Sequence, residues 1–110
     1  MASSLPPGEV FGVDDLIALS PHGVVSRVLA RGAAGNVTLF AFDAGEELSE
    51  HTAPFDALVV TLAGRLALTI GGREVHAVPQ SVVLLPARVP HAVRAVESSR
   101  MLLIMLRESE

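Results

Sequence analysis

The sequence predicts an all-β fold: one β-barrel or β-sandwich domain with a single short helix near the N-terminus. The chain has 110 residues, the usual size of one domain. Half of the residues are hydrophobic and few are charged or aromatic, a balance that suits a compact aliphatic core rather than a disordered chain. After residue 23, short β-like runs separated by Gly and Pro occupy most of the chain.

The N-terminal part is expected to differ from the rest. Residues 1–12 are rich in Ser, Pro and Gly, and we expect them to form an irregular arm ahead of a barrel domain at 13–110. A short helix is expected next, because Asp14 or Asp15 can cap it and the apolar residues that follow give it one apolar side. The turn-forming residues 20–23 are expected to end this helix.

Eight predicted strands follow, at a spacing typical of a sandwich or barrel. Run 65–70 alternates most clearly, as expected for a strand with one face on a core. Gly71-Gly72 can supply the positive φ angles of a tight hairpin, so we expect runs 65–70 and 74–78 to pair antiparallel. The eight predicted runs are 24–30, 37–43, 57–63, 65–70, 74–78, 82–85, 91–96 and 100–107.

The last of these runs is unusual. Residues 101–106 are apolar on both faces, so this strand is expected either to be covered on both sides or to contact a second subunit. The chain also holds more aliphatic residues than one small core is expected to hide. A homodimer is therefore predicted.

Charge and cysteine content exclude several classes of function. The formal net charge is −4 and no cluster of Lys and Arg is present, so we expect neither a nucleic acid nor a membrane as partner. The absence of Cys excludes disulfides and thiolate ligands and fits a reducing compartment. The N-terminus lacks the features of a signal peptide, and no apolar run approaches ~18 residues. A cytoplasmic location is expected.

Four histidines are the candidates for metal binding or proton transfer near neutral pH. His51 follows a predicted turn at 45–50, and His91 follows a proline-containing loop. His51 precedes one predicted strand and His91 begins another, so the two imidazoles can meet if these strands are neighbours at a barrel mouth. His76 is expected on the outer face, since charged residues flank it, and His22 is expected in a turn. Neither of these two is given a role.

The stretch from Gly45 to Gly64 resembles the first conserved motif of the cupins. That motif has a glycine, a His-x-His pair, a glutamate and a closing glycine. His51 stands in the place of the first histidine. Ala53 replaces the second histidine, and Ala57 replaces the glutamate.

A second stretch, 80–91, resembles the second cupin motif, with Pro86 and His91 at matching positions. The resemblance covers roughly residues 37–107. It implies a single-domain cupin-type β-barrel, also described as a double-stranded β-helix or jelly roll, similar to small cupins without an assigned activity. Three positions replace the motif's glycine, glycine and asparagine: Gln80, Arg88 and Ala95.

The resemblance implies a cofactor that this chain retains only in part. Metal-bearing cupins hold Fe, Mn, Ni or Zn with three histidines and one glutamate. Two histidines and a carboxylate suffice for Fe(II), and Asp56 is a candidate third ligand if the bend at Pro54 turns it inward. A solvated turn carboxylate is the competing interpretation. Alternatively, the protein binds no metal, and His51 and His91 are hydrogen-bonded residues of a pocket.

The sequence is compatible with three functions. The first is a cupin-fold module that binds a small molecule, with His51, His91 and Arg88 at the pocket; Arg88 can bind a carboxylate of the ligand, or it is simply an exposed loop residue. The second is a metal-dependent enzyme of the dioxygenase, isomerase or decarboxylase type. The third is a dimeric scaffold joined through runs 24–30 and 100–107. A binding module is favoured over an enzyme, because two imidazoles make a weak metal site.

Overall fold

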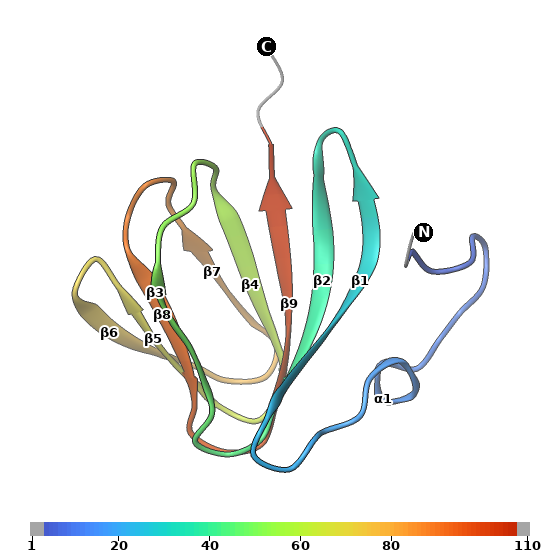
Figure 1. The fold of residues 1–110 in the computed structure, drawn as a ribbon, viewed down its shortest axis with the longest axis horizontal. Helices are drawn as coiled ribbons and strands as arrows, with labels where there is room; N and C mark the ends of the chain where they lie inside the picture. Colours follow the sequence, from blue (N-terminus) through green and yellow to red (C-terminus); the bar gives the residue numbers. More distant parts are fainter. Residues whose placement is uncertain (1–3, 108–110) are drawn as a thin grey trace.

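The computed structural model describes residues 4–107, which form two facing antiparallel sheets (Figure 1). One sheet has the strand order β1-β2-β9-β4-β7 and the other the order β3-β8-β5-β6. The predicted all-β fold is confirmed. The strands are β1 (Val24–Gly32), β2 (Gly35–Phe42), β3 (Glu47–His51), β4 (Ala57–Ala63), β5 (Leu66–Ile70), β6 (Arg73–Ala77), β7 (Ser81–Leu85), β8 (His91–Ala95) and β9 (Ser99–Leu106).

Each of the eight predicted runs overlaps one of the observed strands, and the predicted hairpin is confirmed. β5 pairs with β6 from Leu66↔Ala77 to Ile70↔Arg73. The two residues between the strands, Gly71 and Gly72, have φ angles of 58° and 83°, as a two-residue turn of the I′ type requires.

Two predictions about local structure are wrong. The predicted turn at 45–50 is a strand from Glu47 onward, because this segment pairs with β8. The sequence does not indicate the strand, since β3 is mostly polar and exposed and shows no apolar alternation. The helix α1 (Val13–Leu16) is a single turn whose N-cap residue is Gly12, so Asp14 and Asp15 lie inside it and cap nothing. It ends where the backbone becomes extended, before the predicted turn.

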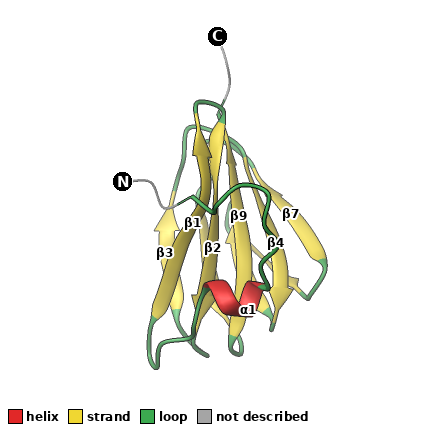
Figure 2. Ribbon diagram, turned by 90° about the vertical axis from the view of Figure 1, so that its right-hand side faces the viewer, coloured by secondary structure: helices red, strands yellow, loops and turns green. Residues whose placement is uncertain are grey.

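The N-terminal segment covers part of the outer face of the five-stranded sheet. α1 lies in front of β2 and β9 in Figure 2. Ile17, next to α1, packs on Leu39 and Ala41 of β2, and Arg27 of β1 donates a hydrogen bond to the carbonyl of Leu16 at 3.1 Å. Within residues 4–107 no helix has the length and apolar character needed to cross a membrane. Residues 1–3 of the predicted arm and 108–110 of the predicted domain lie outside the described residues.

The main core lies between the two sheets. Burial of each large aliphatic or aromatic side chain there stabilises the fold by about 1.5–3 kcal/mol. β9 lies in the middle of the five-stranded sheet, between β2 and β4, so its inner side chains join this core. The largest fully buried apolar side chains of the described chain are Phe42, Leu39, Leu66, Leu68, Leu85, Met101 and Val59.

Candidate functional site

A β-bulge in β3 directs His51 into the barrel. β3 pairs with β8 at Leu48↔Val93 and at His51↔His91, so β3 contains one residue more than β8 between these two pairs. In a regular strand His51 would face away from Leu48, because successive side chains point to opposite faces. The extra residue restores the inward direction, and bulges commonly re-aim side chains in this way. Leu48 and His51 therefore both line the interior.

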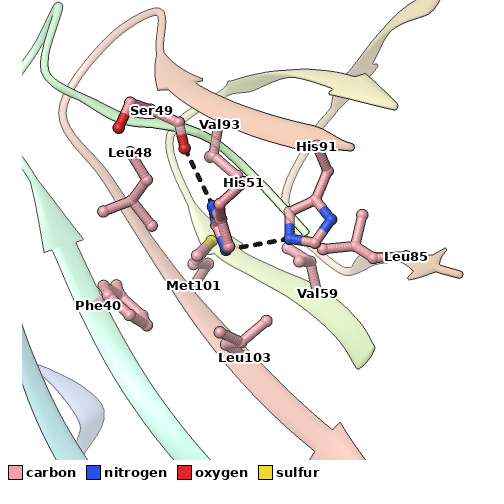
Figure 3. Close-up of a pocket in the computed structure, with 10 residues that line it drawn as sticks. All are labelled: Phe40, Leu48, Ser49, His51, Val59, Leu85, His91, Val93, Met101 and Leu103. Atoms are coloured by element: carbon pink, nitrogen blue, oxygen red, sulfur yellow. Dashed lines mark hydrogen bonds between the residues drawn. The ribbon is translucent and has the colours of Figure 1, made fainter. Parts of the chain in front are cut away.

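The two histidines predicted to meet do so. Their Nε2 atoms are 3.2 Å apart, and their ring centroids are 4.4 Å apart with the planes at 72°. Figure 3 shows the two rings pointing toward one another among apolar side chains. His91 is buried and His51 is exposed at the opening.

The hydrogen bonds of the rings decide which nitrogen atoms carry hydrogen. Nδ1 of His51 lies 3.0 Å from the carbonyl oxygen of Ser49, and Nδ1 of His91 lies 3.2 Å from that of Val89. A carbonyl oxygen only accepts hydrogen bonds, so each Nδ1 is the donor and each neutral ring keeps a bare Nε2. When both rings are neutral, two lone pairs face one another at 3.2 Å, and a proton taken up by either ring turns this contact into the hydrogen bond drawn in Figure 3. This point of the site attracts a proton, a hydrogen-bond donor or a metal ion.

Burial acts on the protonation of His91. It lowers the pKa of His91 below the ordinary value of 6.5, and the charge of the neighbouring His51 lowers it further, while the hydrogen bond to the Val89 carbonyl acts in the opposite direction. His91 therefore stays neutral at a pH at which a free histidine begins to take up a proton.

Both imidazoles border a pocket of about 380 Å³ inside the barrel. This volume falls in the range of small-molecule sites, which are largely apolar with a few convergent polar groups. Strands of both sheets build the wall, and apart from Ser49 and the histidines it is apolar. The lining residues are Phe40, Leu48, Ser49, His51, Val59, Leu85, His91, Val93, Met101 and Leu103 (Figure 3).

Asp56 and Arg88 lie elsewhere. The Oδ1 atom of Asp56 accepts a hydrogen bond from the backbone amide of Ala87 at 2.8 Å, and the side chain is exposed. Together with Arg88, Asp56 borders a separate hollow of about 200 Å³ near Arg107. The structure therefore does not bring Asp56 to the two imidazoles, and Arg88 is not part of the wall around them. The remaining histidines are where the sequence predicts: His76 is on the surface beside Glu74, and His22 is in a turn.

The backbone at the two replaced glycines keeps a glycine-like conformation. Gln80 has a φ of 68° and Arg88 has a φ of 66°. Non-glycine residues adopt this left-handed region at a cost of about 1–2 kcal/mol. The amide of Arg88 donates a hydrogen bond to the carbonyl of Ala53 at 2.7 Å, which holds the loop before β8 against the one after β3. The loop that positions His91 is thus preserved without its glycine.

Metal coordination at this site is limited to two protein ligands. Residues 4–107 contain no group of three or more His, Cys, Asp or Glu side chains placed to hold an ion. Catalytic zinc sites have three protein ligands, and Fe(II) sites of the facial type need a carboxylate beside two histidines. The pair therefore does not complete the metal site that the motif implies.

The sequence pointed to the two histidines but not to most of the pocket. Phe40, Val59 and Leu103 occupy the inner positions of their strands, which alternation marks as buried but not as pocket-lining. Ser49 lies in the bulge, and no signal in the sequence marks a bulge in so polar a strand.

Comparisons with known proteins agree with this fold. A sequence model of the family described as "Cupin domain" matches residues 38–107. None of the curated proteins compared with the chain matches it significantly.

Several solved structures are similar over nearly the whole chain. A conserved protein of unknown function from Streptococcus pyogenes superimposes with a TM-score of 0.90 at 27% identity, covering 97% of this chain and 94% of that one. A cupin superfamily protein from Desulfitobacterium hafniense DCB-2 gives a TM-score of 0.87 at 30% identity, covering 96% of each chain. A cupin 2 conserved barrel domain protein from Leptotrichia buccalis gives 0.84 at 32% identity, covering 88% of this chain and 47% of that one.

Proposed function

The chain belongs to the cupin domain family, and from this premise we propose that its barrel binds a small, mainly apolar molecule whose polar end meets His51 and His91. The observation that carries the proposal is the pocket of about 380 Å³ with an apolar wall and with the two Nε2 atoms 3.2 Å apart at its opening. Such a combination gives a ligand both affinity, through apolar burial, and orientation, through one polar contact.

The polar end of the ligand is expected to be a hydrogen-bond donor. Both Nε2 atoms accept, and in the neutral rings neither supplies a hydrogen to the other. A hydroxyl group placed at the pair donates to one Nε2 and relieves the opposed lone pairs. Removing that hydrogen from the ligand leaves the pair without a partner, which costs about 1 kcal/mol or roughly a factor of five in affinity.

A pair of matched probes tests this proposal. We expect 4-propylphenol to bind the wild-type chain about 3- to 10-fold more tightly than its methyl ether, which has the same apolar body and no donor. Binding is measured by calorimetry and by the rise in melting temperature, since a ligand that binds only the folded state stabilises it. If neither probe binds, the proposal of a ligand pocket is wrong.

A histidine variant with a matched control tests whether the preference for the phenol comes from the His51–His91 pair. His51 is exposed at the opening, so His51→Ala is expected to fold normally and to lose the preference for the phenol over the ether. His76→Ala removes a surface histidine outside the pocket and is expected to keep it. Equal preference in wild type and His51→Ala would show that the pair does not contact the ligand.

A metal ion held by the pair is a second candidate, favoured by the convergence of the two bare Nε2 atoms at 3.2 Å. The ion would have two protein ligands, with water or a bound molecule at its other positions, and it would polarise whatever oxygen shared the site. We expect such a site to be weak, because structural and catalytic sites usually have three or four protein ligands.

Titration with Zn²⁺ tests the second candidate. Wild type and His76→Ala are expected to gain melting temperature as Zn²⁺ is added, whereas His51→Ala is not. A wild-type chain whose melting temperature and calorimetric trace do not respond to Zn²⁺ or Ni²⁺ would reject it, and the result with the phenol probes would be unaffected.

A further inference from the structure

Three polar side chains are buried in the part of the chain that the structure describes, and one of them has no partner. They are Thr61, which is 0% exposed, Ser99 and His91. The hydroxyl of Ser99 accepts a hydrogen bond from the amide of Arg65 at 3.0 Å and donates one to a backbone carbonyl. The Oγ1 atom of Thr61 has no hydrogen-bond partner within residues 4–107. A hydroxyl buried in this way loses its hydrogen bonds to water and gains none in return.

Thr61 lies on the inner face of β4, beside the pocket. Val59, two residues earlier on the same face, lines the pocket, and so does Met101 of β9, which is paired directly with Thr61. Side chains paired in this way have Cβ atoms about 4.5–5.5 Å apart. Thr61 is therefore the next inner side chain of β4 beyond the pocket wall.

The position along β4 places this hydroxyl away from the two histidines. β4 follows His51 after a short loop at the open end of the barrel, and it runs toward the opposite end, where it is joined to β5 (Figure 1). Thr61 is the fifth residue of this seven-residue strand. A molecule that extends inward from the histidines therefore approaches Thr61 with its other end.

The neighbours of Thr61 do not supply the missing partner. Ser81 of β7 is paired with Thr61 on its other side, but the hydroxyl of Ser81 donates to the carbonyl of Val78 at 2.6 Å. Val59 and Met101 are apolar. The unbranched side chain of Met101 can change its rotamer, which would let a bound molecule reach Oγ1 of Thr61.

We infer that Thr61 binds a second polar group of the ligand, at the inner end of the pocket. This inference rests on the proposed function and narrows it to molecules with an apolar body and a polar group at each end. The inner group is neutral, because the wall of the pocket carries no charged side chain besides the two titratable histidines, and a charge buried without a counter-ion is costly. A hydroxyl or a carbonyl group fits, since the hydroxyl of Thr61 both donates and accepts.

Matched pairs of phenols test the inference. We compare 4-(2-hydroxyethyl)phenol with 4-ethylphenol and 4-(3-hydroxypropyl)phenol with 4-propylphenol by calorimetry, so that two chain lengths probe the depth of Oγ1. In at least one pair, wild type is expected to bind the compound with the terminal hydroxyl about 3- to 10-fold more tightly.

Thr61→Val is expected to reverse this preference. Valine keeps the shape of the side chain but leaves the terminal hydroxyl of the ligand buried without a partner, so the same compound is expected to bind about 3-fold more weakly than its plain counterpart. Thr69→Val is the matched control. Thr69 alternates with the buried Leu68 of β5 and so lies on the outer face, and its variant is expected to keep the wild-type preference.

The melting temperature without ligand tests the premise separately. Thr61→Val is expected to melt at the same temperature as wild type or higher, because it removes an unpaired buried hydroxyl. A fall of several degrees would show that the hydroxyl already has a partner, such as a buried water, and would overturn the inference.

The binding data separate this inference from the proposed function. If 4-propylphenol binds wild type but neither terminal hydroxyl is preferred, or if Thr61→Val keeps the preference, the role of Thr61 is refuted and the pocket stands. If none of the phenols binds wild type, both proposals are wrong.

Discussion

The two faces of the five-stranded sheet are built from similar aliphatic side chains but have different surroundings. On β7, Leu85 points inward and is 2% exposed, whereas its neighbour Leu84 points outward and is 48% exposed. The inner face is covered by the second sheet, whose strands β3 and β8 bring His51 and His91 to the pocket between the sheets. The outer face is covered by α1 at one end only. Apolar composition alone therefore does not tell a ligand pocket from an exposed apolar surface. The two imidazoles are what distinguish the pocket.

The largest expected effect tests this contrast with the same substitution at adjacent residues. Leu85→Ala is expected to lower the free energy of unfolding by about 2–5 kcal/mol, because it removes a side chain that is 2% exposed and enlarges the empty space beside the pocket. Leu84→Ala is expected to cost less than about 1 kcal/mol, because this side chain is already about half exposed. Urea unfolding at matched concentration measures both. Equal losses at the two positions would show that the inner and outer faces are not packed as described.

A smaller expected effect concerns His91 and the dependence of the free energy of unfolding on pH. The pKa of His91 is lowered in the folded state, so below the unfolded value of 6.5 the unfolded chain binds more protons than the folded chain. Stability is therefore expected to fall as the pH falls from 6.5 through the lowered pKa of His91, and to be insensitive to this group above 6.5. Urea midpoints across this range measure the effect.

His91→Gln supplies the comparison for this pH dependence. The variant keeps a polar side chain and removes the titrating ring, so its stability is expected to fall less between neutral and mildly acidic pH than that of wild type. A His76→Gln control is expected to follow wild type. If wild type and His91→Gln lose stability in parallel, the neutral state of His91 is not a source of stability.

The smallest expected effect lies at the two ends of β7, the strand on which the contrast is clearest. Gln80 precedes it and Arg88 follows it, both with positive φ. Gln80→Gly or Arg88→Gly relieves the left-handed strain but makes the unfolded chain more flexible, so stability is expected to change by less than about 1 kcal/mol. Gln80→Val, in contrast, is expected to destabilise, since a branched side chain tolerates this conformation poorly. Urea unfolding measures these changes, and a tolerated valine would contradict this account.

The sequence predicted the fold well because its evidence is local. The apolar alternation of β5 and the Gly71-Gly72 turn determine a hairpin without reference to the rest of the chain. β3 was not predicted, because its pairing with β8 rather than its own composition makes it a strand. The α1 cap was misplaced since the helix is a single turn held by its packing through Ile17.

The site was predictable only in part, for a similar reason. His51 and His91 were identified by a resemblance between two short stretches and cupin motifs, and the structure brings them together. Their orientation depends on a bulge and on carbonyl groups, which the residue types do not reveal. Asp56 was a candidate because it is close in sequence to His51. Its carboxylate instead accepts a hydrogen bond from Ala87, thirty-one positions further along the chain.

The central position of β9 has a consequence for the newly made chain. β1 pairs only with β2, and β4 pairs with β7, so β9 is the strand that joins these two pairs into one sheet. Until the ribosome has released residues 99–106, β2 and β4 each present an unpaired edge. Such edges template contact between chains. A chain that ends before β9 is therefore expected to aggregate more readily than the finished chain.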